Sequence, residues 1–233
     1  MLNCLLIGYG EIGKGFKEAY EKYHNFDVID VKLKNTRKYF DYDIMFIAIP
    51  FTENFVEDVK AYQAMYNPKA IVVLSTVEIG TTSQIKNAVH VPIEGKHPYL
   101  ATSIKKWQIF MGGENKIAHQ FFSDANKIVY QIEKPEHTEF LKLQSTTNYG
   151  IMIEYARYVN DCCKALNMDY NEVIAFNTAY NQLYQSMGMP NFQRYILTPP
   201  SGAKQGHCVT PNARILAKQF PNEIADIVAE VRK

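Results

Sequence analysis

Short apolar runs alternate with amphipathic segments along the first half of the chain. The apolar runs lie at 2–7, 26–31, 43–50, 70–75, 88–95 and 107–113. Runs of this length, rich in Val and Ile, predict buried strands, and helix-forming segments such as 14–23 and 55–66 lie between them. Strands that alternate with helices predict an α/β fold with a parallel sheet covered on both faces.

The pattern becomes helical after Pro135. Residues 137–166 contain no proline and one glycine, and apolar residues recur there at helical spacing, which predicts one long helix. Asp169 begins a capping pattern for a further helix, 170–187. A proline-rich loop, 188–211, then precedes two short helices, 212–219 and 221–232. We therefore expect an α/β domain, 1–135, and a smaller helical domain, 136–233, with a long connecting helix.

A glycine-rich loop follows the first predicted strand and opens a helix. Its residues are Gly8, Tyr9, Gly10, Glu11, Ile12 and Gly13, in the pattern G-x-G-x-x-G. In this context the first glycine permits a tight turn, the second admits a pyrophosphate, and the third lets helix and strand pack closely. The helix N-terminus offers N–H groups to phosphate. The motif predicts a Rossmann-type, doubly wound dinucleotide-binding domain, and the alternative is a glycine-rich turn without a ligand.

Asp30 lies at the end of the second predicted strand, 17 residues after Gly13. A carboxylate there can accept hydrogen bonds from both ribose hydroxyls of NAD, and it would repel the 2′-phosphate of NADP. We therefore expect NAD as the cofactor. Lys32 and Lys34 lie just beyond Asp30 and leave NADP as the alternative.

Further site residues are expected where strands end, because ligands of open α/β sheets bind beyond the carboxyl ends of the strands. Pro50 and Ser75 end the third and fourth runs and should border the nicotinamide, together with Thr76, which follows Ser75. His97 follows the fifth run, where it could exchange a proton with a substrate oxygen. Its alternative is a surface loop histidine.

Two residues of the second half carry candidate chemistry. Lys142 lies one turn into the long predicted helix and could stabilise a developing oxyanion, unless it is an ordinary solvated lysine. Cys208 lies in the proline-rich loop after Lys204 and His207, whose charges would favour the thiolate, so it is a candidate nucleophile. Cys4, Cys162 and Cys163 are better explained as core or helix residues.

Four segments together resemble the UDP-glucose and GDP-mannose dehydrogenases. They are Leu74-Ser-Thr-Val-Glu-Ile-Gly-Thr-Thr82, Gly112-Gly-Glu-Asn115, Leu141-Lys-Leu143 and Gln205-Gly-His-Cys-Val-Thr-Pro211, in the order in which that family has them. The resemblance implies NAD-dependent oxidation of a nucleotide-sugar alcohol. It places the nucleophile at Cys208, the oxyanion-stabilising lysine at Lys142, and Thr76 near the nicotinamide.

The chain also departs from the family pattern. The family has an asparagine at the position of Thr146, an aspartate at that of Asn212, and a catalytic glutamate in the segment that here includes His97 and Pro98. We expect a truncated form without the C-terminal sugar-nucleotide-binding domain. Two alternatives stay open: a single-hydride dehydrogenase of the prephenate or hydroxyacid type, and a non-catalytic dinucleotide-binding protein.

Composition and charge exclude several other classes of protein. With 25 Lys and Arg against 24 Asp and Glu, the net charge is +1, which argues against a nucleic-acid binder. The hydrophobic fraction of 47% is enough for a core. The spacing of the four cysteines favours no metal site or disulfide framework. The sequence shows no signal peptide or membrane-spanning run, so we expect a cytoplasmic protein that binds a small-molecule substrate.

A homodimer is also expected, from an aromatic stripe on the long predicted helix. Phe140, Tyr155 and Tyr158 make up this stripe, and burial within one chain is the alternative explanation for them.

Overall fold

The computed structural model describes residues 1–33, 38–39, 41–95, 98–199 and 208–230. The chain forms two compact units, Met1–Lys142 and Leu143–Lys233. The long helix α5, Pro135–Ala165, begins in the first unit and continues into the second. It starts where the sequence predicts the α/β domain to end, seven residues before the division between the units.

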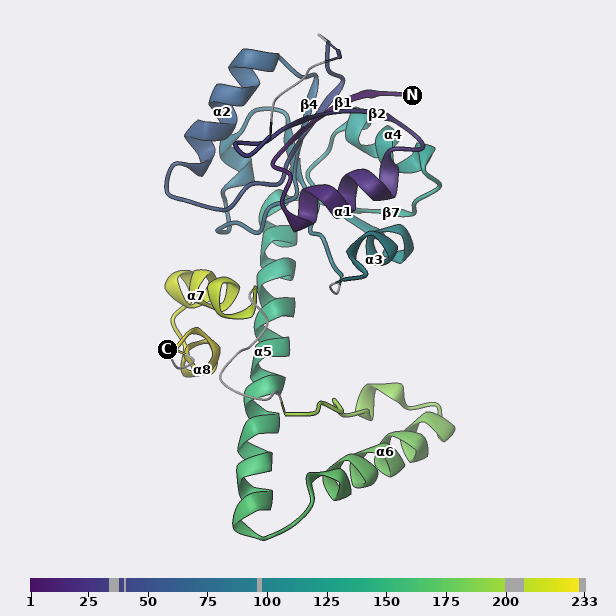
Figure 1. Ribbon diagram of the computed structural model, residues 1–233, viewed down its shortest axis with the longest axis vertical. Helices are drawn as coiled ribbons and strands as arrows, with labels where there is room; N and C mark the ends of the chain where they lie inside the picture. The colour runs from purple at the N-terminus through teal and green to yellow at the C-terminus, as the bar shows by residue number, and fades with distance from the viewer. Residues whose placement is uncertain (34–37, 40, 96–97, 200–207, 231–233) are drawn as a thin grey trace. The chain divides into compact units, whose positions relative to one another are not determined.

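The first unit contains a seven-stranded sheet in the order β2-β1-β3-β4-β5-β6-β7 (Figure 1). The strands are β1 Asn3–Ile7, β2 Asn25–Ile29, β3 Ile44–Ile47, β4 Ala70–Val73, β5 Ala88–His90, β6 Ile109–Gly112 and β7 Val129–Ile132. Strands β1 to β5 pair in parallel, as expected for a doubly wound sheet. The predicted α/β fold is confirmed.

The edge of the sheet beyond β5 differs from the prediction of a parallel sheet. Strand β6 pairs antiparallel with β5, through His90 and Gly112, and parallel with β7, a strand that the sequence pattern did not predict. A buried strand shows the same apolar pattern in either direction, so the pattern could not reveal the reversal. The sequence of β7 lacks the pattern of a buried strand, because all four of its residues are exposed or half-buried.

Helices cover both faces of this sheet. Helices α1 (Glu11–Tyr20), α3 (Leu100–Lys106) and α4 (Lys116–Asp124) pack on one face, in a cluster that includes buried aromatic residues of α1 and α4. Helix α2 (Phe55–Tyr66) packs on the opposite face, as Figure 1 shows. This arrangement brings the carboxyl ends of β1, β3 and β4 to one edge, beside the N-terminus of α1.

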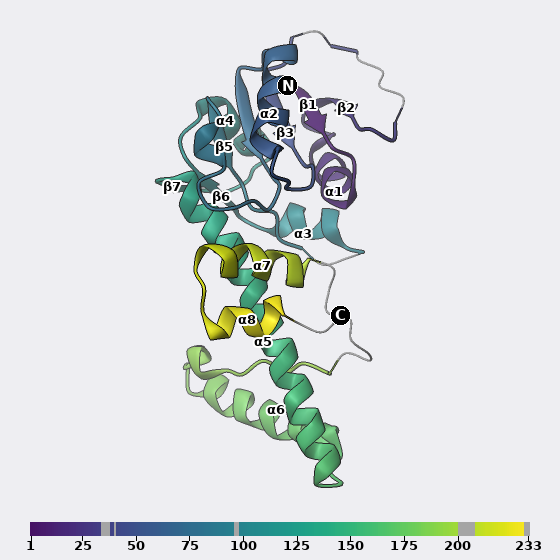
Figure 2. The same ribbon diagram turned by 90° about the vertical axis from the view of Figure 1, so that its left-hand side faces the viewer.

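The second unit consists of helices. They are the rest of α5, α6 Tyr170–Ser186, the short 3-10 helix η2 Pro190–Phe192, α7 Val209–Gln219 and α8 Glu223–Ala229 (Figure 2). Gly150 of α5 lies against Val209 and Val228, and a Cβ built on it would come within 2.6 and 2.5 Å of their side chains. Close packing therefore explains the one glycine of the long helix. The predicted cap of α6 is confirmed, since the Asp169 side chain accepts a hydrogen bond from the Asn171 N–H.

Candidate functional site

The glycine loop joins β1 to α1 in a conformation that needs its first and third glycines. Gly8 has φ +94°, and a Cβ there would lie 2.4 Å from the Ala48 carbonyl oxygen. A Cβ on Gly13 would lie 2.2 Å from the carbonyl oxygen of Gly8 itself. Both contacts are with backbone atoms, which cannot move aside cheaply. The roles that the motif predicts for these two glycines, a tight turn and close packing, therefore agree with the geometry.

Gly10, unlike Gly8 and Gly13, has open space where a side chain would be. It is the N-cap of α1, and a Cβ built on it would meet no atom within 4 Å among the described residues. The fold itself therefore gives no steric reason for a glycine at this position. The close approach of a phosphate to the helix N-terminus would give one, because first-turn N–H groups bind anions.

The carboxylate of Asp30 is fixed next to this loop. It accepts hydrogen bonds from the Tyr9 N–H at 2.7 Å and from the Lys32 N–H at 2.8 Å. These bonds, first that from Lys32 and then that from Tyr9, hold the pKa of Asp30 below its ordinary value. An ionised acceptor thus lies where the second strand ends, as a ribose-binding carboxylate must.

The ends of β3 and β4 are tied together by Ser75. Its hydroxyl donates to the Ile49 carbonyl at 2.6 Å, and the side chain is buried. Thr76 is half-buried next to it, whereas Pro50, at the end of the third run, is exposed. Contact of these residues with the nicotinamide stays a prediction, but the bond from Ser75 shows a structural role that sequence reasoning missed.

The first turns of α5 hold the loop after β4. Glu139, only 1% exposed, accepts hydrogen bonds from the Gly80 N–H at 2.6 Å and from the Thr82 N–H at 2.8 Å. Burial raises the pKa of this carboxyl group. The segment from Ser75 to Thr82, which resembles the family motif, is therefore held by the helix that carries Lys142. In the sequence, the contact between Glu139 and this loop is indicated only by the three-residue spacing of Glu139 and Lys142, which places both on one side of the predicted helix.

His90 lies at the base of the same region. Its side chain is completely buried, and its Nδ1 lies 2.9 Å from the Thr138 hydroxyl. Burial, aided by the nearby positive charge of Lys142, lowers the pKa of His90 to about 3. His90 is therefore neutral at pH 7 and links β5 to α5. The candidate histidine of the sequence analysis is His97, which lies outside the described ranges.

Lys142 is not an ordinary solvated lysine. Its side chain is 17% exposed, its Nζ donates to the Ile93 carbonyl at 2.7 Å, and the same Nζ lies 3.3 Å from a Glu94 carboxylate oxygen. The ammonium group is thus directed at the chain just beyond the carboxyl end of β5. Glu94 was not a predicted site residue, because nothing in the local pattern connects it to a helix almost fifty residues later.

Cys208 is exposed and is the N-cap of α7. A helix N-terminus is an environment that favours a thiolate. One turn later, the Asn212 N–H donates to the Cys208 carbonyl, and the Asn212 side chain donates to the Thr146 hydroxyl, both at 3.3 Å. The two positions at which the chain departs from the family pattern are therefore in contact with each other. The other three cysteines are less exposed, with Cys4 and Cys163 buried.

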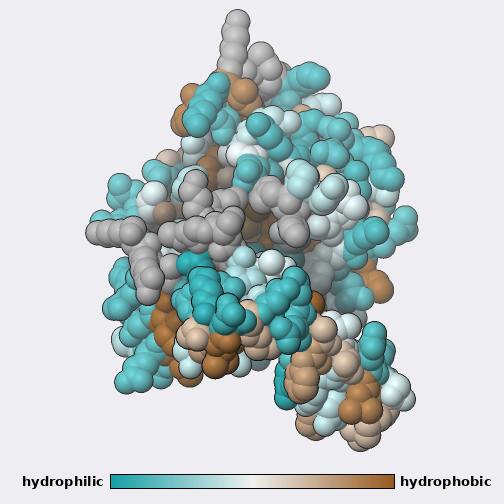
Figure 3. Space-filling view, turned by 60° about the horizontal axis from the view of Figure 1, so that its bottom comes forward, coloured by the Kyte–Doolittle hydropathy of each residue, from teal (hydrophilic) through white to brown (hydrophobic). Residues whose placement is uncertain are grey.

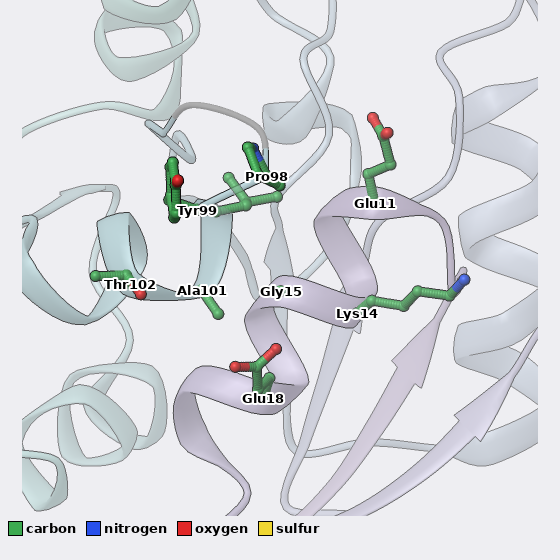
Figure 4. Close-up of a pocket in the computed structure, with 9 residues that line it drawn as sticks. Glu11, Lys14, Gly15, Glu18, Pro98, Tyr99, Ala101 and Thr102 are labelled. Atoms are coloured by element: carbon green, nitrogen blue, oxygen red, sulfur yellow. The ribbon is translucent and has the colours of Figure 1, made fainter.

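A surface cavity of about 300 Å³ lies between α1 and α3 (Figure 4). Its α1 side carries Glu11, Lys14 and Glu18, and its α3 side includes Tyr99 and Thr102. Two carboxylates beside one ammonium group disfavour a phosphate there. The cavity adjoins the glycine loop through Glu11, yet it is lined neither by the other residues of that loop nor by Asp30.

Some predicted features lie outside the described ranges: Lys34, Lys204 and His207. Within the described ranges, no group of His, Cys, Asp and Glu residues could hold a metal ion. No helix of the described chain is both long enough and apolar enough to cross a membrane.

The fold resembles those of several solved dehydrogenases. UDP-D-ManNAc dehydrogenase from Pyrococcus horikoshii matches 99% of this chain and 68% of its own, with TM-score 0.69 and 13% identity. A UDP-glucose dehydrogenase from Pyrobaculum islandicum matches the same shares, with TM-score 0.72 and 14% identity. The 3-hydroxyisobutyrate dehydrogenase of Mycobacterium tuberculosis matches 99% of this chain and 92% of its own, with TM-score 0.72 and 9% identity.

No protein-family model and no curated protein sequence matches the chain. The similar solved structures nevertheless confirm the fold that the sequence motifs indicate, which is of the Rossmann type found in UDP-sugar dehydrogenases. At these identities the similarity defines a dehydrogenase fold and leaves the substrate open.

Proposed function

We propose that this protein is an NAD-dependent dehydrogenase that acts on a CH–OH group. The observation that carries the proposal is the pairing of the glycine loop with Asp30, whose ionised carboxylate is fixed by the Tyr9 and Lys32 N–H groups. The open position at Gly10, beside the N-terminus of α1, suits the pyrophosphate. NAD bound there would supply the hydride acceptor for the substrate carbon, and the proton of the hydroxyl group would pass to a base, for which His97 is the candidate.

Two residues are assigned to the substrate side of this reaction. Lys142 would hold the oxygen that changes from hydroxyl to carbonyl, since its ammonium group is partly shielded and fixed by Ile93 and Glu94. Cys208, exposed at a helix N-terminus, would attack a carbonyl if the oxidation continues from aldehyde to acid. Thr76 and His97 complete the proposed catalytic set, and Pro50 and Ser75 the proposed cofactor site.

The substrate belongs to one of two classes. The UDP-sugar dehydrogenases among the similar structures favour a nucleotide-sugar alcohol, and the 3-hydroxyisobutyrate dehydrogenase favours a small hydroxy acid. The uncharged contact between Asn212 and Thr146 favours a single hydride transfer, because it stands where the resemblance expects an aspartate and an asparagine for the second oxidation.

The first test is cofactor binding, followed by nicotinamide fluorescence during titration with NADH and NADPH. We expect the wild type to prefer NADH, and Asp30→Ala to lose or invert that preference. Asp41→Ala, which removes an exposed carboxylate from the loop after β2, is the matched control and should behave as the wild type. If neither NADH nor NADPH bound to the wild type, the dehydrogenase function would be excluded.

The second test is a substrate screen with NAD, using nucleotide sugars and small hydroxy acids and following NADH formation. Turnover that Lys142→Met abolishes without loss of NADH binding supports the assigned site. Cofactor binding without turnover on either class, together with an unreactive Cys208, would favour a non-catalytic dinucleotide-binding protein instead.

A further inference from the structure

Glu139 is a charged residue inside the protein. Charged side chains ordinarily lie at the surface, and hydrophilic residues, drawn in teal, occupy much of the face that Figure 3 shows. Glu139 is only 1% exposed, and Asp27 is the only other buried carboxylate among the described residues. No lysine or arginine of the described chain forms an ion pair with Glu139. Burial of such a charge is costly, so other groups must stabilise the carboxylate.

Two backbone N–H groups stabilise it. Those of Gly80 and Thr82 donate to different oxygens of the Glu139 carboxylate, at 2.6 and 2.8 Å. Neither N–H group has another partner among the described residues, and Thr82 is completely buried. A buried N–H group without a partner would itself be costly. The carboxylate satisfies both donors at once, whereas a neutral amide side chain has a single acceptor oxygen and could satisfy only one.

The loop that contains these N–H groups is fixed at both ends. We call residues 75–82 the β4 loop. At its start, the Ser75 hydroxyl donates to the backbone just beyond β3 at 2.6 Å, and at its end are the two bonds to Glu139. Between these ends, Thr76 and residues 78–80 are only half-buried, so they are the part of the loop that a ligand can touch. The bonds to Glu139 therefore help to determine where this part of the loop lies.

The same turns of α5 carry Lys142 and are tied to the sheet. The Thr138 hydroxyl lies 2.9 Å from Nδ1 of His90, at the end of β5, and the Lys142 Nζ donates to the Ile93 carbonyl at 2.7 Å. Glu139 and Lys142 are three residues apart and share one side of the helix. One rigid element thus holds both the β4 loop and the lysine assigned to the substrate oxygen.

We propose that Glu139 is a positioning residue for the nicotinamide half of the cofactor. It acts through the β4 loop, because its two bonds hold Thr76 and the backbone that follows near the carboxyl ends of β3 and β4, where the nicotinamide is expected. A loop already held in one conformation binds a ligand without the cost of being ordered first. The adenosine half is assigned to the glycine loop and Asp30, which Glu139 does not contact. The inference rests on the proposed function, since it requires that the chain bind NAD.

The first experiment compares the affinities for NADH and for ADP-ribose, which lacks the nicotinamide, by isothermal titration calorimetry. Glu139→Gln keeps the shape of the side chain but can accept only one of the two bonds. We expect it to weaken NADH binding about tenfold or more, and to leave ADP-ribose binding within about twofold of the wild type. A side chain that contributed only to stability would change the two affinities alike.

Glu136→Gln is the matched control for this substitution. Glu136 lies three residues earlier on α5, and its carboxylate accepts from the Ser83 hydroxyl at 2.6 Å, a bond that the amide oxygen of glutamine can also accept. The control therefore removes a charge near the β4 loop without removing a hydrogen bond. Both affinities should stay as in the wild type. Thermal unfolding shows whether each variant is folded at the temperature of the titration.

A second variant moves the β4 loop without changing α5. Gly80 has φ +93°, a conformation that alanine adopts only with strain, although a Cβ there would meet no atom within 4 Å among the described residues. Gly80→Ala should therefore displace the loop, and so weaken the binding of NADH but not that of ADP-ribose. Gly188→Ala, at φ +69° after α6, has equally open surroundings and should leave both affinities unchanged.

Hydrogen exchange of the cofactor-free protein, followed by mass spectrometry, tests the bonds of Glu139 directly. Peptides that cover the β4 loop should exchange faster in Glu139→Gln than in the wild type or in Glu136→Gln. Unchanged exchange in Glu139→Gln would overturn the proposal.

The titrations separate failure of this proposal from failure of the proposed function. If Glu139→Gln and Gly80→Ala weakened NADH and ADP-ribose binding equally, or weakened neither, Glu139 would have no positioning role, while the dehydrogenase function would stand. A wild type that bound neither ligand would overturn the proposed function, and this inference with it.

Discussion

Asn212 donates a hydrogen bond from its side chain to the hydroxyl of Thr146 at 3.3 Å, and so ties α7 to α5 within the second unit. Asn212 is 7% exposed and lies one turn after Cys208, whose carbonyl accepts from the Asn212 N–H. The contact therefore fixes the start of the helix that presents the candidate nucleophile. It also replaces, with two uncharged groups, the pair of residues that the family resemblance expects.

A double-mutant cycle measures this contact. Thr146→Ala and Asn212→Ala should each destabilise the protein, and together they should cost about 1 kcal/mol less than the sum of the two, as for a neutral hydrogen bond. Urea unfolding gives the free energies. Asn212→Ala combined with Ser123→Ala, which lies in α4 of the first unit, should be additive; an equal deviation from additivity there would mean that the coupling does not come from the hydrogen bond.

The three glycines of the cofactor loop should respond differently to the same change. Gly8→Ala and Gly13→Ala should each destabilise the protein by about 2 kcal/mol or more, because the new Cβ meets backbone oxygen. Gly10→Ala should cost about 1 kcal/mol or less, as for a helix N-cap, but should weaken NADH binding about tenfold or more. Thermal unfolding and fluorescence titration separate the two effects. Unchanged NADH affinity in Gly10→Ala would contradict the proposed pyrophosphate position.

His90 should make stability depend on pH below neutrality. Its pKa is about 3 in the folded protein, against 6.5 in an unfolded chain, so the unfolded state takes up a proton first as the pH falls. The stabilisation is fully present above pH 6.5 and is lost as the pH falls toward 3, by about 1.4 kcal/mol per pH unit in the middle of that range. The free energies of unfolding of the wild type and His90→Asn, measured in urea at each pH, should therefore change differently as the pH falls. Parallel pH dependences of the two proteins would show that His90 does not titrate in this way.

The four cysteines should separate by their rates of reaction with a disulfide reagent. Cys208 is exposed and should react first, and Cys208→Ser should remove that fast phase. Cys4 is buried, and burial raises its pKa, so it should react only after unfolding, as should the buried Cys163. The half-buried Cys162 should react at an intermediate rate. A fast phase that survives in Cys208→Ser would argue against Cys208 as the most accessible thiol.

The elements that the sequence predicted correctly depend on local patterns. The run of strands and helices, the glycine loop between β1 and α1, and the place of Asp30 after β2 all follow from periodicity, turn chemistry and short spacing. The helical pattern after Pro135 likewise gave the long helix. Each of these features involves residues that are close in sequence, which is why the chain alone could specify them.

Only the tertiary structure decided which distant side chains meet. The direction of β6, the bonds of Glu139 to the loop after β4, and the pairing of Lys142 with Glu94 join residues tens of positions apart. The packing of α6 on η2 likewise decided which of its faces stays exposed, although the sequence had already predicted the helix. A periodic pattern shows which residues share a face, but only packing determines what that face touches, and burial of that kind also fixes the charge state of His90.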